Sequence, residues 1–432
     1  MNNKIGNYRW TICALVFFAT TINYLDRAVI SLLKSTLTDE FKWTESDYAN
    51  IVVAFQVCYA IGFLGAGRLI DTLGTKIGYA VATTMWSIAA IGHGLVTNTF
   101  GFFVARGALG VTESGNFPAA VKAIAEWFPK KERAFATGIF NSGANIGAII
   151  APLTVPFIAN KYGWKWAFIL TGLVGFIWLI FWFILYEVPK KQKRLSQAEF
   201  DFIHSDVDEK QPEPNVDEPK ISAMQLLKTR QTWAFAIGKF FTDPVWWFYL
   251  FWLPDFLQKQ YGLSKTDIAF PLAIAYTLST VGSVFGGWLP MWFIKKGWPV
   301  YKSRKTSMLI FASVIVTVIA AQYLGRINMW YAVLIIGLAM GMHQAWSSNI
   351  FTTVSDMFPK SATATVTGIG GMFGAVGGIL IAKSAGKLFD YYKSIGDDQT
   401  GYLIMFIICG LAYIIAWVIM HLLTPTLKKI NI

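Results

Sequence analysis

The sequence has few charged residues for its length. Asp, Glu, Lys and Arg make up only 14% of the 432 residues, whereas soluble domains contain about 25%. Aliphatic, aromatic, Met and Cys residues make up 55%, which is more apolar surface than a soluble chain of this size can cover with polar groups. This composition excludes intrinsic disorder and argues against an ordinary soluble enzyme.

Cysteines and known catalytic or metal-binding patterns are also scarce. The three cysteines, Cys13, Cys58 and Cys409, lie far apart inside apolar runs, so we expect neither a disulfide framework nor a metal site. HExxH and GxSxG do not occur. Residues 370–378 contain five glycines, but no Lys-Ser/Thr follows them, so they predict close helix packing and not nucleotide binding. We expect no enzyme activity and no cofactor.

Long apolar runs dominate the chain. A membrane-spanning helix needs about 20 mostly apolar residues, and twelve runs meet this requirement. The first carries Asp26 and Arg27, so we interpret it as a retained helix and not a signal peptide. The prediction is an all-α membrane protein with six helices in residues 1–187, a linker at 188–231 and six helices in 232–432. The predicted spans are 10–34, 47–70, 77–97, 101–123, 135–158, 165–187, 232–257, 268–294, 306–325, 327–350, 362–386 and 400–423.

The basic residues between these spans predict the orientation in the membrane. With the N-terminus inside, 24 Lys and Arg fall on the inner side and ten on the outer side, as the positive-inside rule requires. Both termini and the linker are therefore predicted to be cytoplasmic, and the net charge of +12 needs no nucleic-acid partner. Ser196 and Glu199 form a predicted capping box that opens a short amphipathic helix in the linker, ahead of a Pro-containing run at 211–214.

The two halves of the sequence repeat each other. Residues 126–150 and 356–380 share nine identities at an offset of 230. A weaker match at an offset of 220 pairs Gly62 with Gly282 and Gly67 with Gly287, although shared composition alone could produce it. Two six-helix halves in the same orientation predict a pseudo-two-fold axis along the membrane normal and a cavity that opens to either side. This is typical of a carrier, and we expect a monomer.

Several motifs resemble the major facilitator superfamily. The run Gly67-Arg-Leu-Ile-Asp71-Thr-Leu-Gly74-Thr-Lys76 resembles its loop motif between helices 2 and 3, whose acidic and basic residues hold helix ends together, and 106–115 resembles its helix 4 motif. In the second half, Met291 stands near the position of the motif's Asp. The chain is most similar to the anion:cation symporter branch and its bacterial hexuronate and sugar-acid transporters, on residues 23–27, 126–129, 242–254, 343–349 and 354–359. This resemblance implies a carrier in the bacterial inner membrane.

Ionisable residues inside the predicted spans are functional candidates because burying charge in a bilayer is costly. A guanidinium binds a carboxylate through two parallel hydrogen bonds, so Arg27 is the first candidate for an acidic substrate. Arg106 either contacts the substrate or pairs with Glu113. Alternatively, both arginines only tie helices together.

The resemblance to proton symporters also implies roles for two carboxylates. Asp26 and Glu113 occupy the positions tied to proton translocation in that branch; alternatively they are permanently ionised and structural. His343 corresponds to Glu113 at the offset of 230, and is either a proton-sensing or a neutral hydrogen-bonding residue. Lys239 and Asp243 are interpreted as a buried structural pair.

Neutral side chains would bind the hydroxyl groups of a sugar acid, and Trp246 or Trp346 would stack on its ring. The candidates are Asn23, Tyr24, Tyr59, Asn141 and Asn145 in the first half, and Tyr249, Gln344, Trp346 and Ser347 in the second. The leading hypothesis is proton-coupled import of a hexuronate or an aldonate. The alternatives are an organic-anion exchanger, a carrier of another carboxylate, and a nutrient sensor that does not transport.

Overall fold

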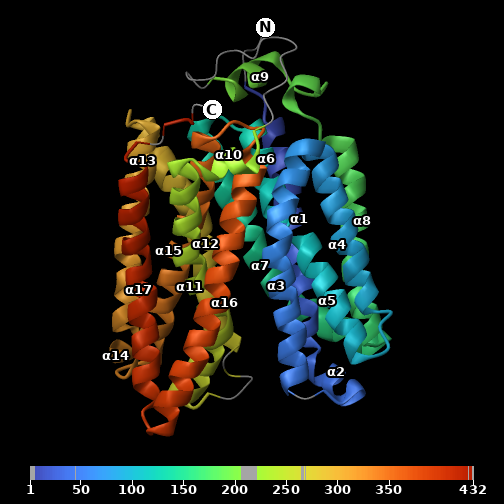
Figure 1. Cartoon of the computed structure of the whole chain (residues 1–432), viewed down its shortest axis with the longest axis vertical. Helices are drawn as coiled ribbons and strands as arrows, with labels where there is room; N and C mark the ends of the chain where they lie inside the picture. Colours follow the sequence, from blue (N-terminus) through green and yellow to red (C-terminus); the bar gives the residue numbers. More distant parts are fainter. Residues whose placement is uncertain are drawn as a thin grey trace.

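The computed structural model describes residues 5–43, 45–205, 221–263, 267, 269–426 and 428–430. In this part of the chain the regular structure consists of α- and 3₁₀-helices without strands, as predicted. The Pro-containing run at 211–214 lies outside the described residues. Figure 1 shows the helices as two bundles that stand side by side, the first blue to green and the second yellow to red.

The described part of the first half forms the first bundle and the start of the linker. A short helix, α2, follows the first long one and was not predicted; its Leu37 packs with Trp43 in a separate apolar cluster. The elements are α1 (Tyr8–Leu32), α2 (Lys34–Phe41), α3 (Glu45–Leu73), α4 (Thr75–His93), α5 (Thr99–Glu113), α6 (Asn116–Trp127), α7 (Lys130–Tyr162), α8 (Trp164–Leu185), η1 (Pro189–Lys191) and α9 (Gln197–Ile203).

The second bundle begins after the linker with a short helix that was also not predicted. Its elements are α10 (Ala223–Leu227), α11 (Arg230–Tyr261), α12 (Ala269–Lys295), α13 (Val300–Ile315), η2 (Val316–Ala320), α14 (Ala321–Gly325), α15 (Met329–Met357), α16 (Thr363–Ser394) and α17 (Asp398–Leu423). Within the described residues, the long elements follow the twelve predicted spans one for one. Two spans are interrupted: the fourth is divided at Ser114 and Gly115, and the ninth contains η2.

Eight of the described helices are long and apolar enough to cross a membrane by themselves. Four spans are not in this set: α4, the pair α5 and α6, α11 and α15. The pair is divided into two helices, and α11 and α15 carry polar residues such as Lys239, Asp243 and His343. Polar side chains on otherwise apolar spans therefore indicate where the two bundles enclose something other than lipid.

The pseudo-two-fold relation predicted from the repeat is present in the packing. The bundles meet along two seams, α3 against α16 and α7 against α12. In the first seam a side chain at Gly67 would overlap the backbone of Ala364, and in the second a side chain at Gly287 would overlap the backbone of Ala134. These contacts are exact mates under the offsets of 220 and 230, so the weaker sequence match reflects a real structural repeat.

The N-terminus, the C-terminus and α9 lie at the same end of the molecule, which we call the terminal face (Figure 1). Ser196 caps α9 by accepting the backbone N–H of Glu199 at 3.3 Å. The Glu199 carboxylate does not complete the predicted capping box; it accepts the backbone N–H groups of Tyr8 and Arg9, each at 3.1 Å, and the Arg9 guanidinium at 3.0 Å. Because a buried carboxylate needs a cationic partner, Glu199 fixes α9 to the first bundle instead.

Candidate functional site

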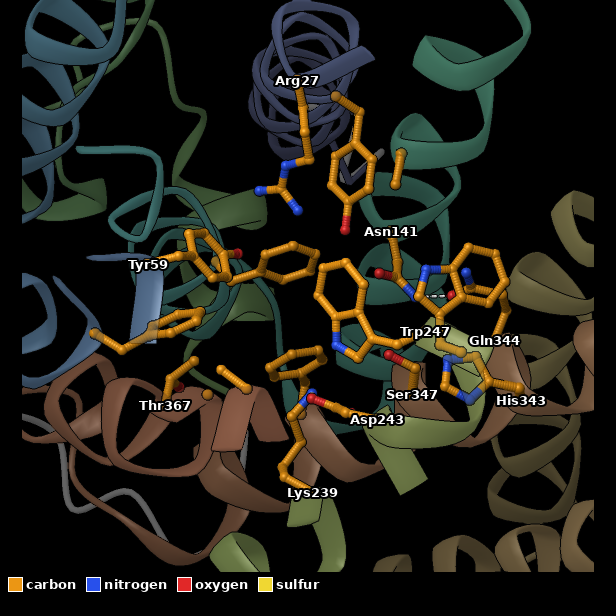
Figure 2. Close-up of a pocket in the computed structure, with 18 residues that line it drawn as sticks. Arg27, Tyr59, Asn141, Lys239, Asp243, Trp247, His343, Gln344, Ser347 and Thr367 are labelled. Atoms are coloured by element: carbon orange, nitrogen blue, oxygen red, sulfur yellow. Dashed lines mark hydrogen bonds and ion pairs between the residues drawn. The ribbon is translucent and has the colours of Figure 1, made fainter. Parts of the chain in front are cut away.

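A cavity lies between the two bundles at the middle of the molecule (Figure 2). Both halves contribute polar side chains to its walls. Those from the first half are Tyr24, Arg27, Tyr59 and Asn141, and those from the second half are Lys239, Asp243, His343, Gln344, Ser347 and Thr367. Aromatic rings, including Trp246, Trp247, Phe117 and Phe351, complete the lining.

Arg27 reaches the cavity from α1 and is paired with Glu113 of α5. Its Nε donates to Glu113 Oε2 at 3.0 Å, and its terminal nitrogen lies 2.9 Å from the same oxygen. The guanidinium is enclosed by the rings of Tyr24, Phe55 and Tyr59, at 4.6, 5.0 and 4.7 Å from their centroids. The other oxygen of Glu113, Oε1, is buried and has no hydrogen-bond partner. One side of this carboxylate is therefore free to hold a proton.

Arg106 does not make the suggested ion pair with Glu113. It donates to the backbone carbonyl of Arg27 at 2.8 Å. Arg106 therefore supports α1 at the residue whose side chain is the first candidate for binding the substrate. It lines an adjoining cavity instead of the central one. Asp26 is 2% exposed, is absent from both linings, and has Glu113 and Arg106 as its charged neighbours. Asp26 thus lies inside the first bundle, behind the Arg27–Glu113 pair.

The polar candidates predicted from the sequence divide into three groups. Tyr24, Tyr59, Asn141, Gln344 and Ser347 line the central cavity. The Asn141 amide donates to Gln344 Oε1 at 2.7 Å, which joins the two halves across the cavity. Asn145 belongs to the adjoining cavity and donates to Ser279 of α12 at 3.4 Å.

Three predicted contacts are absent from both cavity linings. Asn23 is fully buried on α1 and accepts from Arg27 at 3.5 Å. Tyr249 is buried in the second bundle, and Trp346 packs edge-on against Tyr413 with ring centroids 5.5 Å apart. Each lies on the bundle side of its helix, and helical periodicity alone could not determine this because these helices are apolar around most of their circumference.

The sequence analysis named fewer residues of the second half as substrate-binding candidates than line the cavity. Lys239 and Asp243 both line the cavity, 2.7 Å apart, although they were interpreted as a purely structural pair. His343 also lines it; its imidazole stacks on Trp246 at 5.2 Å and its Nδ1 hydrogen-bonds the Tyr413 hydroxyl. Trp247 was not predicted at all. The available signal was the cost of charge on a spanning helix, which applies to Lys239 and Asp243 as much as to Arg27.

The cavity continues away from the terminal face. The adjoining cavity shares Tyr24, Arg27, Ala144, Trp246 and Trp247 with the central one. It extends along later turns of α1, earlier turns of α3 and later turns of α11, where its lining includes Ser31, Tyr48, Val52, Leu250 and Tyr276. Since α1 starts at the terminal face, this extension leads toward the opposite face, and the terminal side is the closed one.

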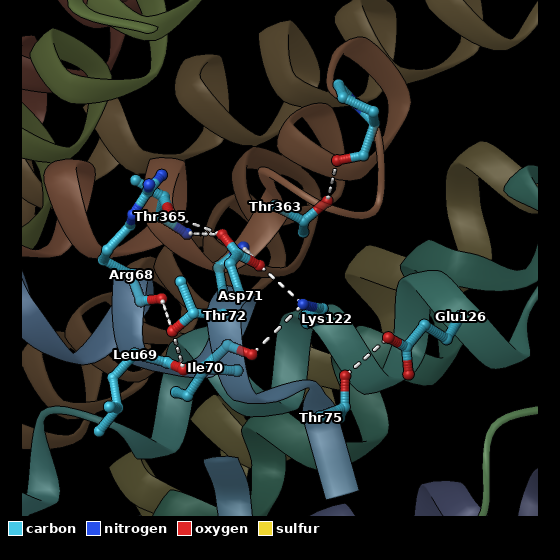
Figure 3. Close-up of polar contacts among 12 residues, drawn as sticks. Arg68, Leu69, Ile70, Asp71, Thr72, Thr75, Lys122, Glu126, Thr363 and Thr365 are labelled. Atoms are coloured by element: carbon cyan, nitrogen blue, oxygen red, sulfur yellow. Dashed lines mark hydrogen bonds and ion pairs between the residues drawn. The ribbon is translucent and has the colours of Figure 1, made fainter. Parts of the chain in front are cut away.

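The first seam is sealed at the terminal face by the loop motif (Figure 3). Asp71 at the end of α3 accepts from Lys122 at 2.9 Å, and from the backbone N–H and the hydroxyl of Thr365 on α16 at 2.7 and 2.6 Å. One carboxylate therefore connects the two bundles. Gly74 directly precedes α4 with φ of 79°, a backbone conformation that favours glycine. Lys76 pairs with Glu187 at 2.8 Å within the first half.

The second seam is sealed by different residues. Arg133 of α7 donates to the backbone carbonyl of Ser355 at 2.9 Å, and Arg304 of α13 donates to Asp356 at 2.5 Å and to the carbonyl of Lys130 at 2.7 Å. Two guanidinium groups thus cross between the bundles in opposite directions. Met291 stands where Asp71 would fall at the offset of 220, and the polar contacts of the second seam come from this cluster instead.

No metal site is present in the described ranges, because they contain no group of three or more His, Cys, Asp or Glu that could hold an ion. What they contain is a polar, partly charged cavity between two pseudo-symmetric bundles, which extends toward one face and is bounded at the other by the polar contacts of the two seams. This arrangement defines a membrane transport protein.

The chain belongs to the Major Facilitator Superfamily, which it matches over residues 16–382. It is 34% identical to the hexuronate transporter of Escherichia coli K12, over 90% of this chain and 89% of that one. It is 34% identical to the galacturonate transporter of Dickeya chrysanthemi (74% and 91%) and 26% identical to the D-galactonate transporter of Escherichia coli O6:H1 (90% and 91%). The fold is similar to that of the proton:xylose symporter XylE, with a TM-score of 0.73 at 14% identity, covering 98% of this chain and 97% of that one.

Proposed function

We propose that this protein imports a sugar acid, a hexuronate or an aldonate, together with protons, by alternating access across the bacterial cytoplasmic membrane. The named relatives transport hexuronates, galacturonate and galactonate, which supports a sugar-acid substrate. The excess of Lys and Arg on one side of the spans supports a cytoplasmic terminal face. We propose that a monomer suffices, since one chain encloses the whole cavity.

The observation that carries the proposal is the position of Arg27. Its guanidinium lines a cavity between the bundles, where an organic acid leaving water needs an opposite charge. A guanidinium offers two parallel N–H groups to a carboxylate and stays protonated when buried. The hydroxyl groups of the sugar would bind Tyr24, Tyr59, Asn141, Gln344 and Ser347, which surround the same space.

Proton coupling follows from competition for Arg27. Glu113 occupies the guanidinium through one oxygen, so a substrate carboxylate that takes its place leaves Glu113 buried without a cation. A proton on the free oxygen, Oε1, removes that unpaired charge. Asp26, which lies behind the pair, would accept or supply this proton inside the first bundle.

The two seams would control which face of the membrane the cavity opens to during transport. In the conformation described, Asp71 with Thr365 and Arg304 with the carbonyl of Lys130 hold the terminal face closed while the cavity extends toward the opposite face. Substrate would enter from that face. Rocking of the bundles would then break the two seals, close the outer end and release substrate at the terminal face.

Purified protein in liposomes tests this function. With the outside more acidic, we expect accumulation of at least one of galacturonate, glucuronate, galactonate and gluconate above its external concentration. Glu113→Gln should abolish the gradient-driven accumulation, whereas Glu187→Gln, a surface control, should retain it. Counterflow that a pH gradient does not accelerate in the wild type would favour an exchanger, and unchanged accumulation in Glu113→Gln would exclude Glu113 from coupling.

A further inference from the structure

We propose that Lys239 and Asp243 form a second proton-coupled anion site, in which Lys239 receives an oxygen-rich end of the substrate and Asp243 takes up the compensating proton. This inference rests on the proposed function. It assigns to the second half a role that the resemblance places only on Asp26 and Glu113.

The first argument is position. Lys239 and Asp243 are four residues apart on α11, so they share one helix face, and both line the central cavity opposite Arg27 (Figure 2). The cavity therefore has an ion-paired cation on each wall, one from each bundle. An acid bound between them would lie with its carboxylate near one cation and the far end of the sugar near the other.

The second argument is access. The Asp243 side chain is 22% exposed, whereas that of Glu113 is 0% exposed, although both are ion-paired. A carboxylate exchanges protons with the medium only where water reaches it, and the space next to Asp243 is the cavity itself. Of the two cavity pairs, the second one therefore presents its carboxylate to the transport path.

The third argument is the room made for this carboxylate. A side chain at Gly374 of α16 would overlap Asp243 Oδ2 and displace the carboxylate, so the glycine leaves room for Asp243 against α16. Lys239 is held by Asp243 and by the face of Phe351, 4.2 Å from the ring centroid. When a substrate oxygen binds the Lys239 ammonium in place of Asp243, the Asp243 carboxylate has no other cation on the same face of α11 to pair with.

The titratable groups around Asp243 leave Lys239 as its direct cationic partner. His343 of α15 is an electrostatic neighbour of Lys239. Tyr413 of α17 is an electrostatic neighbour of Asp243. The lining residues of α16 are Thr367, Gly371 and Ala375, which do not titrate. The opposite wall carries Tyr24, Tyr59 and Arg27, and Arg27 is already paired with Glu113.

The charges balance over both walls of the cavity. Before binding, Arg27, Glu113, Lys239 and Asp243 sum to zero; a substrate monoanion and one proton from the cavity, bound by an Asp243 oxygen, keep that sum at zero, and a second proton on Glu113 brings it to +1. With both carboxyl groups neutral, no buried carboxylate is left without a cation while the bundles rock around the bound substrate. Release of the substrate returns the proton and restores the pair.

Asp243→Asn in liposomes tests the inference, with the ratio of pH-gradient-driven accumulation to counterflow as the readout. One coupled proton supports about tenfold accumulation per pH unit, since one unit corresponds to 1.36 kcal/mol. With a gradient of one unit we expect this ratio to fall about tenfold in Asp243→Asn and to recover in Asp243→Glu. Asp397→Asn is the matched control, because its carboxylate only caps α17 and Asn caps equally well.

Three results would overturn the inference. An unchanged ratio in Asp243→Asn would mean that proton coupling depends on the first half alone, and the proposed function would stand. Equal loss of accumulation and counterflow in an Asp243→Asn protein that elutes as a folded species would assign Asp243 to substrate binding alone. Failure of the wild type to move any sugar acid would overturn the proposed function, and this site with it.

Discussion

The two seams between the bundles share their backbone contacts but not their charges. Gly67 on Ala364 and Gly287 on Ala134 are symmetry mates, as the offsets in the sequence require. The polar seals are unrelated: Asp71 bridges the first seam, whereas Arg133 and Arg304 cross the second. Small residues set the distance between two packed helices, and this distance is hard to change. The polar contacts that close a seam need only residues that neutralise one another, so they can differ between the two seams.

The same contrast holds inside the cavity. The first half contributes a carboxylate that is fully covered, Glu113, and the second half contributes one that faces the cavity, Asp243. The two halves therefore share their backbone contacts and differ in their charged residues. The predictions below separate what the halves share from what they do not.

Arg27→Lys should have the largest effect. The charge remains, but the parallel N–H groups and the fixed distance to Glu113 are lost, so we expect uptake to fall by about 100-fold, equivalent to about 3 kcal/mol. Arg326→Lys, at an exposed site paired with Gln399, should leave uptake within about twofold of the wild type. Initial rates in liposomes measure both, and near-normal uptake by Arg27→Lys would contradict the role of the guanidinium.

Valine at either shared glycine should have the next largest effect. Gly67→Val and Gly287→Val would each overlap the opposite bundle, so we expect uptake to fall by about tenfold or more because the terminal face cannot close. Gly65→Val on the same helix meets nothing within 4 Å and serves as the control. If one of the two seam variants transports normally, the symmetry of the seams does not extend to function.

Asp71→Asn tests the part of the seams that is not shared. The substitution removes the carboxylate that pairs with the ammonium of Lys122, a residue that is only 4% exposed. We expect about fivefold slower uptake because the closed terminal face loses one of its polar contacts. Met291→Leu, at the corresponding position of the second half, should change uptake by less than about twofold. Equal effects of the two substitutions would indicate that Asp71 is not a seal.

Lys76→Gln should have the smallest effect. Its bond to Glu187 lies at the surface and is worth about 0.5 kcal/mol or less. The Lys76 hydrogen bond lowers the pKa of Glu187, so the stabilisation is present above the ordinary Glu range and is lost as the pH falls through the lowered value. Melting in detergent should therefore separate wild type and Lys76→Gln slightly at pH 7 and not at a pH well below the lowered pKa; a gap that persists in acid would refute this origin.

The spans were predictable because bilayer thickness demands long apolar runs, whatever the neighbouring helices do. The interruption at Ser114 and Gly115 was not, since both residues sit inside an apolar run that satisfies the length rule. The extra helix α2 was missed for a similar reason: it is too short for periodicity and is held by contacts of Leu37 and Trp43 with distant aromatic residues.

The candidate site was predictable in its residue types and less so in its pairings. Arg106 and Glu113 are seven residues apart, which is about 10 Å along a helix, so a direct ion pair within α5 was unfavourable, and Arg27 on the neighbouring α1 took that place. Which wall of an apolar helix faces the cavity depends on how the bundles meet. Asn23, Tyr249 and Trp346 therefore fell outside the cavity, whereas Lys239 and Asp243 fell inside it.

The central claim is that the cavity selects an acid through Arg27. Liposomes loaded with labelled galacturonate, or with whichever acid is taken up best, can be chased with that unlabelled acid or with the matching neutral sugar. We predict that only the acid exchanges with the label in the wild type. Equal exchange with the neutral sugar, which has no carboxylate to offer the guanidinium, would contradict the account.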